Sequence, residues 1–109
     1  MTSPRILFVC DAGPGVGGGH VMRCLTLAGA LIAKGAACAF VRTPEAADIL
    51  ARYAPDMPLA DEAVEADLVV LDSYRMAPAV ETAWRARAKQ LAVIDDLARP
   101  HDADLVLDP

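Results

Sequence analysis

The sequence predicts an α/β protein built on a parallel β-sheet with helices on both faces. Short continuous apolar runs such as Arg5–Cys10 alternate along the chain with segments such as His20–Lys34, in which apolar residues recur every three or four positions. Continuous apolar runs are typical of strands buried on both faces, and the longer spacing is typical of amphipathic helices. Because strands and helices alternate, crossover connections and therefore parallel strands are expected.

The individual elements follow from this pattern in chain order. The expected strands are the apolar runs Arg5–Cys10, Ala37–Arg42, Asp67–Asp72, Gln90–Asp95 and Asp104–Asp108. The expected helices are His20–Lys34, Pro44–Tyr53 and Pro78–Lys89. Gly35 is suited to ending the first helix, and Pro44 is suited to beginning the second. The proline-containing segment Ala54–Asp61 is expected to be a loop with room for a short strand.

Composition narrows the class of protein. The chain has 109 residues, of which 55% are hydrophobic and 23% charged, which fits one folded domain. Its net charge of −5 argues against nucleic acid as a partner, although backbone N–H groups can still bind an anionic sugar nucleotide. The odd number of cysteines (Cys10, Cys24 and Cys38) fits reduced, buried thiols better than disulfides. With no signal peptide and no membrane-length apolar stretch, we expect a cytoplasmic protein without a membrane partner.

The end of the chain bears on domain organisation. The last expected strand runs to Pro109 without a helix to cover it. A doubly wound domain usually covers its last strand, so we expect residues 1–109 to be the N-terminal domain of a longer, two-domain protein.

Aspartates follow several of the expected strands. In open α/β sheets the ligand crevice lies beyond the carboxyl ends of the strands. Asp11, Asp72 and Asp95 all occupy such positions, so we expect them at one rim of the sheet, although any one of them could simply cap a helix. The side chains of Asp95 and Asp96 should diverge because they are neighbours on a strand end.

A glycine-rich loop, residues 13–19, separates the first strand from the first helix. Glycines let a ligand approach the backbone closely, and the N–H groups of a helix N-terminus favour anions, so Gly17, Gly18 and Gly19 are expected to bind substrate. A simple turn is the alternative. The loop also matches the dinucleotide fingerprint, with Arg42 placed where an NADP-selecting arginine could sit. The Walker phosphate motif fails, because no Lys and Ser/Thr follow Gly18.

His20 is the candidate catalytic residue. It begins a helix, where the helix dipole favours a neutral imidazole that can accept a proton, as a general base must. A loop-capping role is the alternative. Arg23 can hold a carboxylate or a substrate oxygen, and Cys24 could share a metal with His20, but no further soft ligand is in view, so neither metal nor cofactor is expected. His101 lies in a polar stretch and is expected on the surface.

Three motifs resemble those of one enzyme family. They are Asp11 with the glycine loop and Gly19–Ala28, then Leu68–Tyr74, and finally Ile94–Asp104. In order and spacing they resemble the UDP-sugar hydrolases of pseudaminic acid biosynthesis and the related spore-coat polysaccharide biosynthesis proteins. The chain departs from the family at Ala12, where serine is common, and at Pro14.

The resemblance implies a glycosyltransferase-B-like enzyme with two Rossmann-type domains. Such an enzyme removes UDP from UDP-2,4-diacetamido-2,4,6-trideoxy-β-L-altropyranose by attack of water at the anomeric carbon, in a nonulosonic acid pathway that decorates flagellin or surface polysaccharide. His20 would activate the water, and the sugar pocket would be lined by Asp11, Arg23, Asp72, Tyr74 and Asp95. The second domain would hold most UDP contacts, so residues 1–109 alone are expected to be inactive.

Two other functions remain open at this point. A glycosyltransferase half would use the same base to deprotonate an acceptor hydroxyl. A non-catalytic dinucleotide-binding module would use only the glycine loop.

Overall fold

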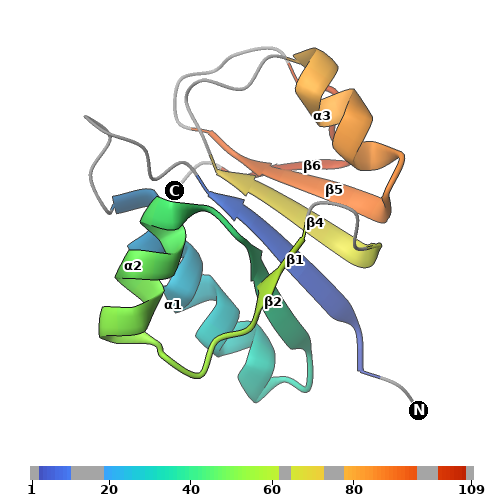
Figure 1. Ribbon diagram of the computed structural model, residues 1–109. Coiled ribbons are helices and arrows are strands. Elements are labelled where there is room, and N and C mark those ends of the chain that lie inside the picture. Colours follow the sequence, from blue (N-terminus) through green and yellow to red (C-terminus); the bar gives the residue numbers. More distant parts are fainter. Residues whose placement is uncertain (1–2, 11–18, 62–64, 73–77, 96–100, 108–109) are drawn as a thin grey trace.

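The computed structural model describes residues 3–10, 19–61, 65–72, 78–95 and 101–107. Its strands are β1 (Arg5–Cys10), β2 (Ala37–Val41), β3 (Leu59–Ala60), β4 (Ala66–Asp72), β5 (Ala88–Ile94) and β6 (Leu105–Leu107). Its helices are α1 (Gly19–Ala33), α2 (Pro44–Tyr53) and α3 (Pro78–Arg85). All strand pairs are parallel, so the predicted sheet is confirmed (Figure 1).

The strand order is β3-β2-β1-β4-β5-β6, as in Rossmann-like folds. From β1 the chain builds outward through β2 and β3, then returns to the other side of β1 and builds outward through β4, β5 and β6. Ligands in such sheets bind at this reversal, which here lies between the carboxyl ends of β1 and β4.

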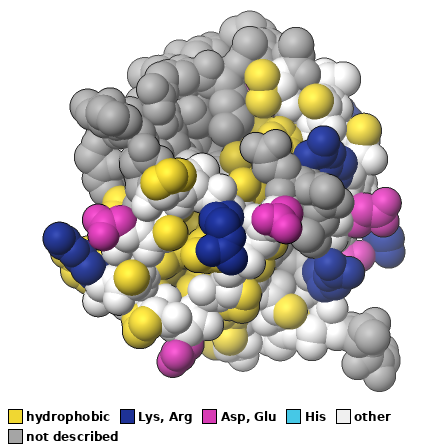
Figure 2. All heavy atoms as spheres, viewed as in Figure 1, with side chains coloured by type: hydrophobic (Ala, Val, Ile, Leu, Met, Phe, Trp, Pro, Cys, Tyr) yellow, Lys and Arg dark blue, Asp and Glu magenta, His cyan; other side chains and the backbone are white. Residues whose placement is uncertain are grey.

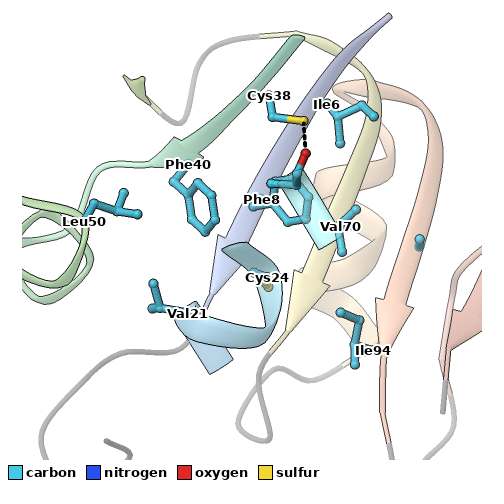
Figure 3. Packing of buried hydrophobic residues seen from close by; sticks show 11 residues of the cluster. Ile6, Phe8, Val21, Cys24, Cys38, Phe40, Leu50, Val70 and Ile94 are labelled. Atoms are coloured by element: carbon cyan, nitrogen blue, oxygen red, sulfur yellow. Dashed lines mark hydrogen bonds between the residues drawn. The ribbon is translucent and has the colours of Figure 1, made fainter. Parts of the chain in front are cut away.

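Helices α1 and α2 cover one face of the sheet, and α3 covers the other, as predicted (Figure 1). On the first face, Phe8 and Phe40 stack with their ring centroids 5.0 Å apart, beneath Val21 and Cys24 of α1 and beside Leu50 of α2 (Figure 3). The Cys38 thiol donates to the carbonyl of Ala28, as the dashed line in Figure 3 shows, and burial raises the pKa of this thiol. On the second face, Trp84 of α3 packs against Leu71, Leu91 and Val93.

The ends of α1 and α2 agree with the capping residues of the sequence. Gly35 adopts a φ of 99° and ends α1, while the N–H of Ala36 donates to the carbonyl of Leu31 and that of Gly35 donates to Ile32. This pattern is a Schellman motif. The Thr43 hydroxyl caps α2 by accepting from the N–H of Ala46, with Pro44 in the first turn.

Two predicted boundaries were wrong by two residues or more. Helix α3 ends at Arg85 instead of Lys89, and β5 begins at Ala88 instead of Gln90. The reason is tertiary: Ala88 and Gln90 pair with the beginning of β4, and this pairing overrides the helix propensity of the alanines and basic residues there. The segment Ala54–Asp61 contains the short strand β3.

Charges of both signs are interspersed on the described part of the face drawn in Figure 2. No helix in the described ranges is long and apolar enough to cross a bilayer. The large apolar side chains that are exposed are distributed over α1, α2, α3 and β6, at Met22, Ile32, Tyr53, Val80, Leu105 and Val106.

Candidate active site at the carboxyl edge of the sheet

Asp72 is the centre of a buried polar cluster at the carboxyl end of β4. Its side chain is fully buried, and its Oδ1 lies 2.5 Å from Nδ1 of His20. Arg23 donates to the same carboxylate twice, from Nε to Oδ2 at 2.5 Å and from Nη2 to Oδ1. The cluster therefore joins the second and fifth residues of α1 to the last residue of β4.

The fold brings these residues together through the strand reversal. Helix α1 begins after β1, and β4 pairs directly with β1 so that Asp72 is level with Cys10. Residues alternate between the two faces along a strand, and Val70 packs on the α1 face, so Asp72 also points toward α1. His20 and Arg23 are three residues apart on α1 and therefore share the side that meets Asp72.

Cys24 completes the cluster from one turn further along α1. Its thiol lies 3.5 Å from Oδ2 of Asp72 and donates to it. A hydrogen bond with Cys10, burial and the charge of Asp72 together raise the pKa of Cys24 far above its usual range. The thiol therefore stays protonated, which does not suit a metal ligand, and the described residues contain no group of three or more His, Cys, Asp or Glu that could hold a metal.

This geometry assigns a tautomer to His20. A carboxylate only accepts hydrogen bonds, so the 2.5 Å contact with Asp72 assigns the proton to Nδ1, and the longer 3.4 Å approach of Arg23 Nη2 to the same nitrogen accompanies its bond to Oδ1 of Asp72. In the neutral ring the lone pair is then on Nε2, which can take a proton from a reacting group. The positive charge of Arg23 balances the negative charge of Asp72. The carboxylate therefore orients the imidazole of His20 without leaving a net charge on the Arg23–Asp72 pair.

Asp95 lies on the same edge but serves a different cluster. It follows β5 directly, and its Oδ2 lies 2.5 Å from Nε2 of His101, whose Nδ1 lies 2.7 Å from Oε2 of Glu81 on α3. Because α3 covers the face opposite α1, the carboxylates of Asp95 and Asp72 point to opposite faces of the sheet. The expectation that His101 is a surface residue was wrong, since its side chain is only 5% exposed.

The structure brings together only some of the expected site residues. His20, Arg23 and Asp72 are in direct contact, and Gly19 is the exposed first residue of α1 beside them, whereas Asp95 is bound within the α3 cluster. The predicted residues Asp11, Gly17, Gly18 and Tyr74 lie outside the described residues, as does Asp96. Glu81 was not predicted from the sequence, where its only signal is an acidic residue on the buried side of α3.

A hollow of about 280 Å³ lies at the opposite, amino edge of the sheet, near Arg5, Asp67 and Lys89. The backbone N–H of Arg5 and the ammonium of Lys89 both donate to Asp67 and lower its pKa. These groups are exposed and already paired with one another, and the hollow lies far from the strand ends where such sheets bind ligands. The polar cluster around Asp72 is therefore the stronger candidate site.

No family model, curated protein or solved structure matches this chain. The site must therefore be interpreted from its own geometry and from the sequence motifs.

Proposed function

We propose that this chain supplies the general base for hydrolysis of a UDP-activated 2,4-diacetamido-trideoxy sugar, giving free sugar and UDP for nonulosonic (pseudaminic) acid biosynthesis. The observation that carries the proposal is the contact between Nδ1 of His20 and the buried carboxylate of Asp72 at the strand reversal. An imidazole oriented by a buried carboxylate is the recurring arrangement of a general base in acyl transfer to water, and the proposal uses it to activate water for attack on a sugar. The motif resemblance supplies the identity of the sugar and of the nucleotide.

In the proposed reaction, His20 and Asp72 each have one role. Nε2 of His20 takes a proton from water while the water oxygen bonds to the anomeric carbon. The bond between that carbon and the UDP oxygen breaks, and UDP leaves with its electron pair. Asp72 stabilises the imidazolium that forms, and the proton then passes to solvent. No redox cofactor is needed, because no atom changes its oxidation state.

Asp72 and Arg23 act in this proposal as positioning residues. The carboxylate of Asp72 already accepts from His20, Arg23 and the Cys24 thiol, which occupies its oxygens with protein donors. Arg23 holds the carboxylate in two places, so the direction of the imidazole is fixed before any substrate arrives. Such preorganisation lowers the cost of reaching the transition state.

A dinucleotide-binding module is the second candidate, and the strand order favours it. The order of the six strands is that of dinucleotide-binding domains, and Arg42 is exposed directly after β2. That function has no use for a buried His–Asp pair, so we place it second. Titration with NADPH, followed by its fluorescence, tests it directly.

The test of the proposed function is steady-state hydrolysis by His20→Gln in the full-length gene product, since the resemblance implies that a second domain holds the UDP. Glutamine can still donate to Asp72 but cannot accept a proton from water. We expect kcat to fall by roughly 10²–10⁴-fold with little change in KM, because water is activated only in the transition state.

Thr26→Ala is the matched control, since Thr26 lies on the exposed side of α1 and binds only the carbonyl of Met22 among the interactions described. It should keep full kcat. Near-normal kcat in a well-folded His20→Gln variant would rule out the proposed base. Release of UDP that required a sugar acceptor would favour a glycosyltransferase.

A further inference from the structure

A second buried cluster on the α3 face contains two carboxylates and one imidazole. Both ring nitrogens of His101 are in contact with a carboxylate, Nδ1 with Glu81 and Nε2 with Asp95. The three side chains are at most 5% exposed, so water does not separate them. The proposed hydrolysis uses none of these groups.

The contacts fix the number of protons in the cluster. Ionised carboxylates only accept hydrogen bonds, and a neutral imidazole has a single N–H to donate. Two contacts from one ring therefore need a second proton, and the raised pKa of His101 places it on the ring, as an imidazolium between Glu81 and Asp95. If that proton leaves, one of the two carboxylates loses the donor that His101 supplied in a dry environment, at a cost in free energy.

The cluster also joins elements that are distant in the sequence. Directly after His101, the N–H of Asp102 donates to Glu81, and the carboxylate of Asp102 accepts from Thr82 and Arg85 of α3. Two residues further, Asp104 exchanges hydrogen bonds with the backbone of Leu91 in β5. The segment 101–104 thus connects α3 and β5 to β6.

We propose that Glu81, His101 and Asp95 form a proton-dependent latch that holds the segment 101–107 against α3 and β5 and loosens as the proton is lost. The charged groups around His101 support this arrangement. Glu81 faces it from α3 and Asp95 from the end of β5, whereas Arg85 of α3 is bound by Asp102 and Asp104 of its own segment. Among the described residues, the positive charge that contacts both buried carboxylates is therefore the imidazolium itself.

The direction of the pH effect follows from the pKa of His101 in the folded and in the unfolded state. Burial alone would lower the pKa of His101, but the hydrogen bonds and charges of Glu81 and Asp95 outweigh burial and raise it above its ordinary value of 6.5. A group whose pKa is raised by folding stabilises the folded state fully below its unfolded value. The stabilisation should therefore decline as the pH rises above about 6.5 and vanish beyond the raised pKa.

Nitrogen NMR of the imidazoles tests the latch in the 109-residue chain. The sequence has only two histidines, so His20→Gln leaves His101 as the single imidazole. As the pH is raised, we expect the His101 ring to lose its second proton at a higher pH than the ordinary value of 6.5. Loss of that proton at or below pH 6.5 would overturn the proposal.

Thermal unfolding of His101→Gln gives a second, independent readout. Between pH 6 and pH 8 the wild-type Tm should fall, and that of the variant should fall by much less. Amides of β6 should lose protection from hydrogen exchange over the same range in the wild type. Equal pH dependence in both proteins would contradict the latch, and if the variant does not fold, the NMR measurement still decides.

Discussion

Asp72 combines a structural and a chemical role in one side chain. Its carboxylate is fully buried, yet it accepts from an imidazole, a guanidinium and a thiol, all from α1. An uncompensated buried charge is costly, so the carboxylate is tolerated only because these donors surround it. The same donors fix the direction of His20. Stability and orientation of the base therefore depend on the same contacts.

Asp72→Asn should consequently destabilise the fold. The amide keeps the size of the carboxylate but leaves Arg23 without its charged partner and presents a donor to other donors. We expect a loss of about 2–4 kcal/mol, below the upper range for buried pairs because the Arg23 side chain is 29% exposed. Urea unfolding measures it, with the exposed Asp56→Asn as a control that should change stability by less than about 0.5 kcal/mol. Equal stability of the two variants would contradict this account.

At the scale of single residues, the sequence allowed a partial prediction of the cluster. Its strand-end position predicted that Asp72 lies at this edge of the sheet, and His20 and Arg23 were both predicted as site residues of the first helix. That they touch one another could not be predicted, because it depends on β4 pairing with β1. His101 was assigned wrongly because its partner Glu81 is 20 residues away and its surroundings in the sequence are polar.

Among the elements, α1 shows how one position determines where a helix ends. Gly35 has a φ of 99°, a conformation that L side chains rarely adopt, although a Cβ there would meet no atom within 4 Å. Gly29 lies inside α1, is exposed, and likewise has open space for a Cβ. The two glycines therefore differ in backbone conformation and not in crowding.

Alanine at these two positions should have opposite effects. Gly35→Ala should destabilise by about 1–2 kcal/mol, because it forces a Cβ into the left-handed region. Gly29→Ala should stabilise by up to about 1 kcal/mol, because alanine loses less backbone entropy in a helix. Urea midpoints of both variants against the wild type provide the measurement. A change of the same sign at both positions would show that φ is not the deciding property.

The helices also show which of their ends can be predicted from local sequence. The bounds of α2 were predicted correctly, and Pro44 marks its beginning in the sequence itself. The end of α3 was not, because the residues after Arg85 favour a helix locally but pair with β4 in the folded chain. Local capping residues can be read from sequence, whereas competition from sheet pairing cannot.

For the molecule as a whole, ionisable groups also make the stability of the fold decrease at acid pH. The Thr82 hydroxyl and the Arg85 guanidinium bind Asp102 and lower its pKa below the ordinary value of 3.8. A carboxyl whose pKa is lowered by folding contributes stability above its unfolded value and loses it as the pH falls through the folded one. The contribution is small because the pair is largely exposed.

Asp102→Asn should therefore be less stable than the wild type at pH 6, and the difference should shrink as the pH falls below about 4. Urea midpoints at pH 6, 4 and 2.5 measure this convergence. Arg5→Ala serves as a comparison, because it leaves Asp102 unchanged and keeps the backbone N–H that binds Asp67. The loss of stability at acid pH should therefore persist in this variant. A difference that stayed constant down to pH 2.5 would exclude a contribution from the ionisation of Asp102.

The lengths of the strands have a consequence for behaviour at high concentration. The central strands β4 and β5 have seven residues each, whereas the described edge strands β3 and β6 have two and three. Exposed edges offer unpaired N–H and C=O groups to other molecules and so act as templates for aggregation. In this sheet the longest strands are in the centre, where their N–H and C=O groups are paired on both sides. The short edge strands leave few such groups for a neighbouring molecule to pair with.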